Sequence, residues 1–275
     1  LIGNRTAGEQ QRILGGVVLA GVLGLVVMTV VAMNGASRSS AQVAASGQAL
    51  MQSQRLAKSV SQALVGNPKA FPEVRESSEI LTRAVNGLRT GDAEVAAAPA
   101  PVQEALEPML PLVERAGKNA GIVLAQQKTL TDVGQALRAL NRQSSDLLEA
   151  AEAVATLKLQ QDSSAAEISA SAQLVMLTQR IGKSANEFLS SEGVTAEAVF
   201  LLGKDLNTFR EIGRGLAEGS SELRLPAPRD AATRERVGAL MKQYEETRRA
   251  AGVILSNLPG LVAARDAQAS IVTDS

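Results

Sequence analysis

The sequence predicts an all-α protein in which a transmembrane helix is followed by two tandem modules, each a helical bundle of the four-helix type. The chain has 275 residues, of which 45% are hydrophobic and only 2% aromatic. It is rich in Ala, Leu, Gln, Glu and Arg and poor in strand-favouring runs, so helix is expected almost throughout. One long uncharged apolar segment and one internal repeat define the rest of the architecture.

The composition excludes several classes of protein. The chain contains no Cys and no His, which removes disulfides, the usual zinc and haem ligands, and Ser-His-Asp or Cys-His catalysis. We therefore predict a non-enzymatic protein with no catalytic residues, metal or cofactor. Lys and Arg total 28 and Asp and Glu total 28, with four Phe and one Tyr. This neutral balance with few aromatic residues argues against a nucleic-acid partner, which needs a basic surface and stacking side chains.

Residues 13–33 carry no charged side chain and are predicted to form the transmembrane helix. About 21 residues at 1.5 Å each span the thickness of a hydrocarbon core. A cleaved signal peptide is the alternative, but its apolar part is usually shorter and needs a cleavage site of small residues. Arg5 and Arg12 precede the apolar run, so residues 1–12 are expected in the cytoplasm and the following residues in the bacterial periplasm.

The region after the apolar segment contains an internal repeat, because the stretch Gln48–Ser59 recurs as Gln173–Ser184. Two further matches follow in the same order along the chain: Gly87-Leu88 and Gly91 with Gly215-Leu216 and Gly219, and Ala120-Gly121 with Ala251-Gly252. Repeats in the same order indicate a duplicated structural unit. We predict two modules, residues 38–160 and 161–275. The motif residues identical in both copies are Gln48, Met51, Gln54, Arg55, Lys58 and Ser59, paired with Gln173, Met176, Gln179, Arg180, Lys183 and Ser184.

Each copy is predicted to begin with a motif helix, at about 39–65 and 165–191. Gly66-Asn-Pro68 and Glu192-Gly193 predict turns, and a second helix follows to about Leu88 or Leu216. An Ala- and Pro-rich break then precedes further helix, which Pro108 and Pro111 delay or kink in the first copy. The Gly-poor run 127–189 is expected to form one nearly continuous helix joining the copies.

A heptad spacing within the motif helices predicts the seam of a bundle. The seam residues are Val43, Leu50, Ala57 and Leu64, with Ile168, Val175, Gly182 and Leu189 in the second copy. Met51 and Met176 are expected to be core residues, since Met commonly fills gaps between packed helices.

The polar residues of the motif share helix faces and have two interpretations. In the first, Arg55 is structural and pairs with a carboxylate such as Glu73, Glu76 or Glu79 on the next helix. In the second, the motif is a recognition patch near a subunit interface, where Arg binds an anionic ligand. The twelve identical motif residues are therefore ligand or interface candidates, and replacing Arg55 or Arg180 with Ala is expected to alter signalling more than folding.

The stretch Ser46–Ala57 resembles the first-helix motif of the PilJ-type sensory module. That module occurs in type IV pilus methyl-accepting chemotaxis transducers and, as a single copy, in NarX-type nitrate sensor kinases. The resemblance covers nearly the whole chain. It implies the periplasmic sensory region of a homodimeric inner-membrane chemoreceptor that controls twitching motility, with pilus subunits as input partners. Output would pass to a CheA-like kinase through a cytoplasmic domain beyond Ser275.

The NarX-type motif places a nitrate-binding Arg at the position of Leu50 and Val175. Neither side chain can donate a hydrogen bond to an oxyanion, so nitrate sensing is not expected. Two alternatives stay open: the sensor region of a histidine kinase or cyclic-dinucleotide enzyme, and a membrane-anchored helical scaffold.

Overall fold

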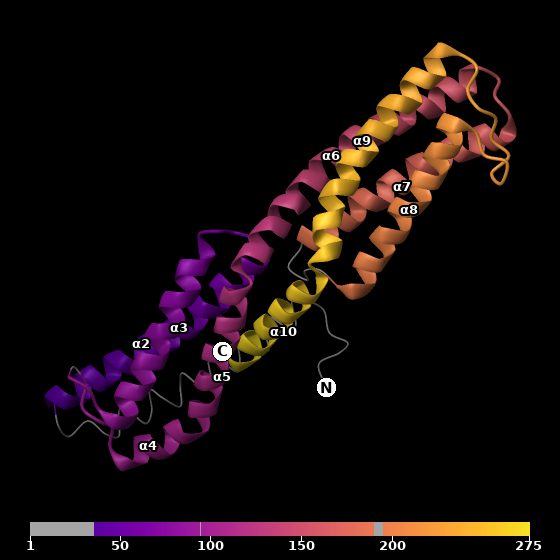
Figure 1. Cartoon of the computed structure of the whole chain (residues 1–275). Helices are drawn as coiled ribbons and strands as arrows, with labels where there is room; N and C mark the ends of the chain where they lie inside the picture. Colours follow the sequence, from indigo (N-terminus) through magenta and orange to yellow (C-terminus); the bar gives the residue numbers. More distant parts are fainter. Residues whose placement is uncertain (1–35, 94, 190–194) are drawn as a thin grey trace. The chain divides into compact units, whose positions relative to one another are not determined.

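The computed structural model describes residues 36–93, 95–189 and 195–275, which divide into two compact units (Figure 1). The first unit holds the described residues up to Ala63 together with Pro68–Ala125 and Asp266–Ser275. The second unit holds Leu64–Asn67 and Gln126–Arg265. Described residues form helices joined by turns and loops, with one isolated β-bridge between Ser220 and Leu225, so the all-α prediction is confirmed.

The predicted transmembrane helix, residues 13–33, and the preceding segment 1–12 lie outside the described residues. Within the described part of the chain, no helix combines the length and the apolar character that a membrane crossing requires.

The first unit is built from α2 (Ala36–Leu64), α3 (Ala70–Thr90), α4 (Ala100–Leu106), α5 (Leu110–Ala125) and the C-terminal end of α10 (Leu258–Asp274). The predicted turn after α2 is confirmed, and Gly66 adopts a φ of +74° there. A 3₁₀ turn, Glu107–Met109, separates α4 from α5 and contains Pro108, while Pro111 lies in the first turn of α5. The prolines therefore interrupt the third helix as predicted, because proline removes a backbone donor and clashes with the preceding turn.

The second unit contains α6 (Gln127–Gln160), α7 (Ala165–Leu189), α8 (Ala196–Glu218) and α9 (Ala231–Ser256). The helix α6 packs against α7 and α9, and α8 packs against the same two helices. This closed ring of neighbours is a four-helix bundle. Its core contains the fully buried Leu140, Leu174, Ile181, Phe209 and Tyr244. The hydroxyl of Tyr244 donates to the carbonyl oxygen of Leu206 at 2.9 Å, and burial raises the pKa of Tyr244 to about 12.

The prediction of a nearly continuous helix over 127–189 is wrong, because α6 ends at Gln160 and α7 begins at Ala165. Asp162 adopts a φ of +50°, a conformation that ends a helix. Ser164 and Glu167 then form a capping box: the Glu167 carboxylate accepts from the backbone N–H of Ser164 at 3.1 Å, and the Ser164 hydroxyl accepts from that of Glu167 at 3.4 Å. The spacing Ser-x-x-Glu was the signal in the sequence.

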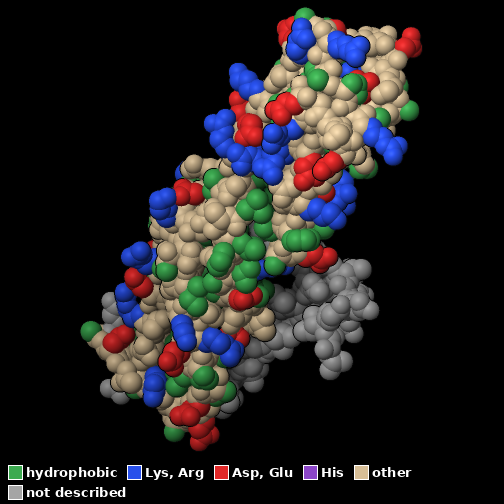
Figure 2. Space-filling model, turned by 45° about the vertical axis from the view of Figure 1, so that its right-hand side comes forward, with side chains coloured by type: hydrophobic (Ala, Val, Ile, Leu, Met, Phe, Trp, Pro, Cys, Tyr) green, Lys and Arg blue, Asp and Glu red, His purple; other side chains and the backbone are tan. Residues whose placement is uncertain are grey.

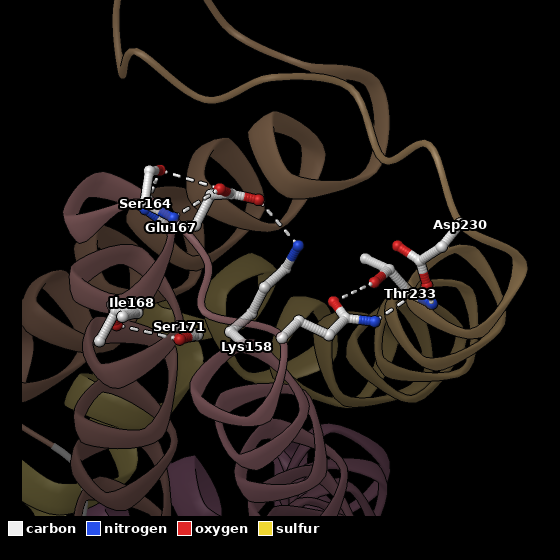
Figure 3. Close-up of polar contacts among 8 residues, drawn as sticks. Lys158, Ser164, Glu167, Ile168, Ser171, Asp230 and Thr233 are labelled. Carbon is white, nitrogen blue, oxygen red and sulfur yellow. Dashed lines mark hydrogen bonds and ion pairs between the residues drawn. The ribbon is translucent and has the colours of Figure 1, made fainter.

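Two separate polar groups connect the C-terminal end of α6 to the beginnings of α7 and α9 (Figure 3). Lys158 of α6 forms an ion pair with Glu167 of α7 at 2.8 Å, with side chains only 5% and 12% exposed. Burial would raise the pKa of Glu167, but hydrogen bonds from Lys158 and Ser164 outweigh it, and the pKa is lowered. Gln161 donates to the carboxylate of Asp230 at 3.1 Å and accepts from the hydroxyl of Thr233 at 3.0 Å.

Asp230 caps the N-terminus of α9 and makes the stability of the bundle depend on pH. Its carboxylate accepts from the backbone N–H of Thr233 at 2.7 Å, and this bond is the main reason that its pKa falls from 3.8 to about 2. A depressed carboxyl pKa stabilises the fold fully above its unfolded-state value, and that contribution is lost as the pH falls through the folded-state value.

We therefore expect the melting temperature to fall more steeply between pH 4 and pH 2 in the native protein than in Asp230→Asn. Asn caps a helix about as well as Asp but does not titrate. Thermal melts followed by circular dichroism at both pH values check this expectation. Parallel pH profiles for the two proteins would contradict it.

The predicted heptad seam is wrong in its register. Val43 is 45% exposed, and the other seam residues whose side chains are described are only partly buried. The core faces of the motif helices are instead formed by Leu56, Val60 and Ala63 on α2, and by Leu174, Leu177, Ile181, Ala185 and Phe188 on α7. The expectation that Met51 and Met176 are core residues is also wrong, because these side chains are 56% and 46% exposed.

The internal repeat is visible in the way α3 and α8 end. Gly91 and Gly219 have φ values of +78° and +87°, and each backbone N–H donates at 2.9 Å to the carbonyl oxygen four residues earlier, of Gly87 or Gly215. A Cβ atom at either capping glycine would lie about 3 Å from a backbone nitrogen, of Ala97 or Ala227. Only glycine fits this cap without strain. The two copies therefore share a backbone conformation as well as a motif.

Candidate functional site

The motif helices each present an exposed polar stripe. We call it the motif face and define it as the exposed motif residues: Gln48, Met51, Gln54 and Lys58 on α2, with Gln173, Met176, Gln179 and Lys183 on α7. Positions three, four and seven apart lie on one side of a helix, so the residues of each stripe point outward together. The opposite side of each helix, α2 or α7, is buried and holds its stripe in place.

Arg55 lies beside the first stripe and is tied to the next helix. Its guanidinium lies 3.3 Å from the carboxylate of Glu76 on α3, and the two side chains are 41% and 55% exposed. The structure thus contains the predicted pairing of Arg55 with a carboxylate of the following helix. An ion pair this exposed contributes little to stability, since water and salt screen it.

Arg180, the equivalent of Arg55 in the second copy, pairs with a buried carboxylate. Its guanidinium lies 2.8 Å from the carboxylate of Asp205 on α8, and Asp205 is buried with its side chain only 5% exposed. The equivalent position in the first copy is Ser77, fully buried, whose hydroxyl has no hydrogen-bond partner among the described residues. A buried carboxylate depends on its partner far more than an exposed one does. The two copies of the motif are therefore not electrostatically equivalent.

The two motif serines do not belong to the exposed stripe. Ser59 is 1% exposed, and its hydroxyl donates to backbone carbonyl oxygens of its own helix, of Arg55 at 2.8 Å and of Leu56 at 3.2 Å. Ser184 is partly buried. These contacts favour a structural role for Ser59.

The motif face provides amide, thioether and ammonium groups without a catalytic arrangement. Among the described residues, no group of three or more Asp or Glu side chains is placed to hold a metal ion. Basic and acidic side chains lie interspersed over the surface seen in Figure 2. An exposed helix face with mixed polar and apolar groups suits contact with another helix or a protein partner.

Sequence reasoning missed Asp205 and Gln52. Asp205 occupies a core-facing position of α8 that follows Val199 and Leu202 at helical spacing, so the signal was a lone acid within an apolar stripe. Gln52 lies inside the motif itself and is 3% exposed, with an amide oxygen that lacks a hydrogen-bond partner among the described residues. The internal repeat held the signal for Gln52, because the equivalent position of the second copy is the buried Leu177.

Comparison with known protein families gives a match over two segments of the chain. Residues 31–139 and 157–269 each match the family PilJ, described as "Type IV pili methyl-accepting chemotaxis transducer N-term". The segments together cover more than half of the chain and contain the two copies of the motif. The fold and the duplicated motif thus define a helical sensory region of the chemotaxis-transducer class, and the chain belongs to the PilJ family. The family description is that of a sensory receptor and not of an enzyme.

Among curated proteins, the chain is similar to Protein PilJ of Pseudomonas aeruginosa. The two are 24% identical over 233 residues, which cover 83% of this chain and 34% of the relative. The chain therefore spans about a third of the length of this relative.

Proposed function

We propose that this chain is the periplasmic sensory region of an inner-membrane chemoreceptor, which signals to a cytoplasmic CheA-like kinase pathway controlling type IV pilus twitching motility. The observation that carries the proposal is the PilJ family match over two segments, each containing one copy of the motif. Residues 13–33 serve as the membrane anchor, and residues 1–12 lie in the cytoplasm. The apolar length of the anchor and its flanking Arg5 and Arg12 support this topology.

The two sequence copies, residues 38–160 and 161–275, act as tandem sensory modules in this proposal. The matching caps at Gly91 and Gly219 support a common origin of the two copies. The motif face of each copy contacts a second subunit or an input partner such as a pilus subunit. Signal transfer then requires that the partner has unequal affinity for two packing states of the helices.

The topology can be tested directly because the native chain has no Cys. We expect a single Cys at the exposed position Gln54 to react with a membrane-impermeant maleimide in cells whose outer membrane is permeabilised and whose inner membrane is intact. A Cys at Thr6 in the N-terminal flank is the matched control and should react only after the inner membrane is broken. Equal protection of both positions in intact cells would contradict a periplasmic motif face.

The two motif arginines should differ in their effect on stability, and for Arg180 this revises the expectation that its replacement alters signalling more than folding. We expect Arg180→Ala to cost about 2 kcal/mol, because it leaves the buried Asp205 carboxylate without its partner. Arg55→Ala should change the stability by less than about 0.5 kcal/mol, because the Glu76 carboxylate stays in water. Urea unfolding followed by circular dichroism measures both.

The double variant Arg180→Ala/Asp205→Ser tests the cause of the expected loss. It introduces the residue of the equivalent position in the first copy, Ser77, and removes the unpaired charge, so most of the stability should return. Equal costs for Arg55→Ala and Arg180→Ala would contradict the electrostatic difference between the two copies.

A further inference from the structure

The first unit contains two buried side-chain oxygens that lack a hydrogen bond, one on α2 and one on α3. They are the amide oxygen Oε1 of Gln52 and the hydroxyl oxygen Oγ of Ser77, and neither has a partner among the described residues. Gln52 is 3% exposed and Ser77 is fully buried. Native proteins pair the large majority of their buried polar side-chain atoms, so each of these oxygens weakens the packed state of its helix.

Both positions have satisfied counterparts in the second copy. The motif alignment pairs Gln52 with Leu177, a buried apolar side chain that needs no hydrogen bond. Ser77 corresponds to Asp205, because each precedes the capping glycine of its helix by the same number of residues. The Asp205 carboxylate is paired with Arg180 at 2.8 Å. At these two positions the buried side chain of the second copy is therefore apolar or paired.

Other buried polar side chains of the same helices are paired as well. Ser59 on α2 donates to the carbonyl oxygen of Arg55, and Ser171 and Thr178 on α7 donate to carbonyl oxygens of their own helix at 2.9 and 2.8 Å. A third unpaired oxygen among the described residues belongs to Gln143, which lies on α6. Within the described parts of α2, α3, α7 and α8, both unpaired oxygens therefore lie in the first copy.

Side-chain size does not separate the two copies in the same way. At some core positions the first copy has the larger residue, and at others the smaller one: Phe71 against Val199 and Val85 against Gly213, but Ala63 against Phe188 and Ala84 against Ile212. These differences act in opposite directions. Polar pairing differs in one direction only, and it favours tighter attachment of α7 to α8 than of α2 to α3.

The unpaired oxygens lie where α2 meets the core. Gln52 precedes the buried Leu56 by one helical turn, so the two side chains share the buried side of α2. Ser77 has the position on α3 from which Asp205 on α8 reaches α7, so the repeat places Ser77 on the side of α3 that faces α2. Movement of α2 away from α3 admits water to both oxygens and removes the cost of leaving them unpaired.

The polar contact between α2 and α3 opposes this movement only weakly. It is the ion pair of Arg55 and Glu76, with a distance of 3.3 Å and side chains 41% and 55% exposed. Water and salt screen a pair this exposed. The equivalent contact in the second copy ends on the Asp205 carboxylate, which is only 5% exposed and loses a needed partner when α7 moves.

We infer that α2 is a mobile element built into the first unit, held to α3 more weakly than α7 is held to α8. The packed state leaves Gln52 and Ser77 unpaired and an open state hydrates both, so the open state is a populated minor state. Local opening of this kind uses the least stable elements of a fold, and a partner that binds one state better shifts the balance. The inference concerns motion within the first unit and does not depend on the chemoreceptor assignment.

Hydrogen exchange followed by mass spectrometry tests the inference on the 275-residue chain in detergent. Peptides covering residues 48–59 and 173–184 report on α2 and α7. We expect faster exchange of 48–59 than of 173–184 in the native chain. Gln52→Leu, which introduces the residue of the second copy, should slow the exchange of 48–59 by about tenfold, the effect of removing one unpaired buried polar group. An unchanged rate in Gln52→Leu would overturn the inference.

A matched control and a reverse substitution make the test specific. Gln54→Leu makes the same change at an exposed position of the same peptide and should leave its exchange rate as in the native chain. Leu177→Gln places an unpaired amide in α7 and should speed the exchange of 173–184. Ser77→Ala serves as a second test of α2 and should also slow 48–59. Equal slowing by Gln54→Leu and Gln52→Leu would overturn the inference, because burial would then not be the cause.

Discussion

Replacing Phe209 with Ala is expected to destabilise the second unit by about 3–5 kcal/mol, the usual cost of removing a buried aromatic side chain. Phe209 is fully buried in the bundle and stacks on Tyr244 with ring centroids 5.0 Å apart. The substitution removes apolar burial, leaves a cavity and eliminates the contact between the rings. Urea unfolding followed by circular dichroism, with the midpoint and slope compared to those of the native chain, measures the loss.

Phe200 is the matched control for this prediction, because it lies on the same helix and is 71% exposed. Phe200→Ala should change the free energy of unfolding by no more than about 0.5 kcal/mol. Similar effects of the two substitutions would contradict the core assignment of Phe209.

The second large effect is expected at the ion pair between α6 and α7. Glu167→Gln retains an N-terminal capping amide but leaves the ammonium of Lys158, 5% exposed, without an anion. Removing one partner of a buried ion pair costs about 3–5 kcal/mol, and we expect a loss near the lower end because Glu167 keeps some contact with water. The free energy of unfolding in urea gives the comparison.

The double variant Lys158→Met/Glu167→Gln should recover much of that loss, because no buried charge remains. The exposed pair of Arg214 and Glu218, with side chains 63% and 65% exposed, supplies the control. Glu218→Gln should cost less than about 0.5 kcal/mol. If Glu167→Gln lowered the free energy of unfolding by no more than Glu218→Gln does, Lys158 would have to reach water in the folded protein. That result would contradict the burial of this ion pair.

Helix content, the turn at Gly66 and the proline-interrupted third helix could be predicted because each depends on local residue chemistry. The break between α6 and α7 could not be predicted from Gly and Pro alone. It depends on a positive φ at Asp162 and on a capping box formed by Ser164 and Glu167, residues that also occur inside helices. Helix periodicity predicted the wrong seam register, because several phases of an Ala- and Leu-rich helix look equally apolar.

The candidate site shows the same division between local and tertiary information. Pairing of Arg55 with an acid on the next helix could be predicted, since three carboxylates follow at suitable spacing in the sequence. The burial of Asp205 and the exposure of Met51 and Met176 depend on how helices pack against one another. The identical motif residues Arg55 and Arg180 therefore have different electrostatic surroundings in the two copies.

The measurement that tests the proposed function most directly is pilus-dependent twitching in the native bacterium. A strain with Lys58→Glu and Lys183→Glu on the two motif faces is compared with the parent strain and with a deletion of the gene, at equal protein levels in the membrane. Both side chains are exposed, so the fold should tolerate the change. We predict a reduced twitching zone in the variant and the deletion strain. Normal twitching in the deletion strain would contradict the assignment of this chain to a receptor that controls twitching motility.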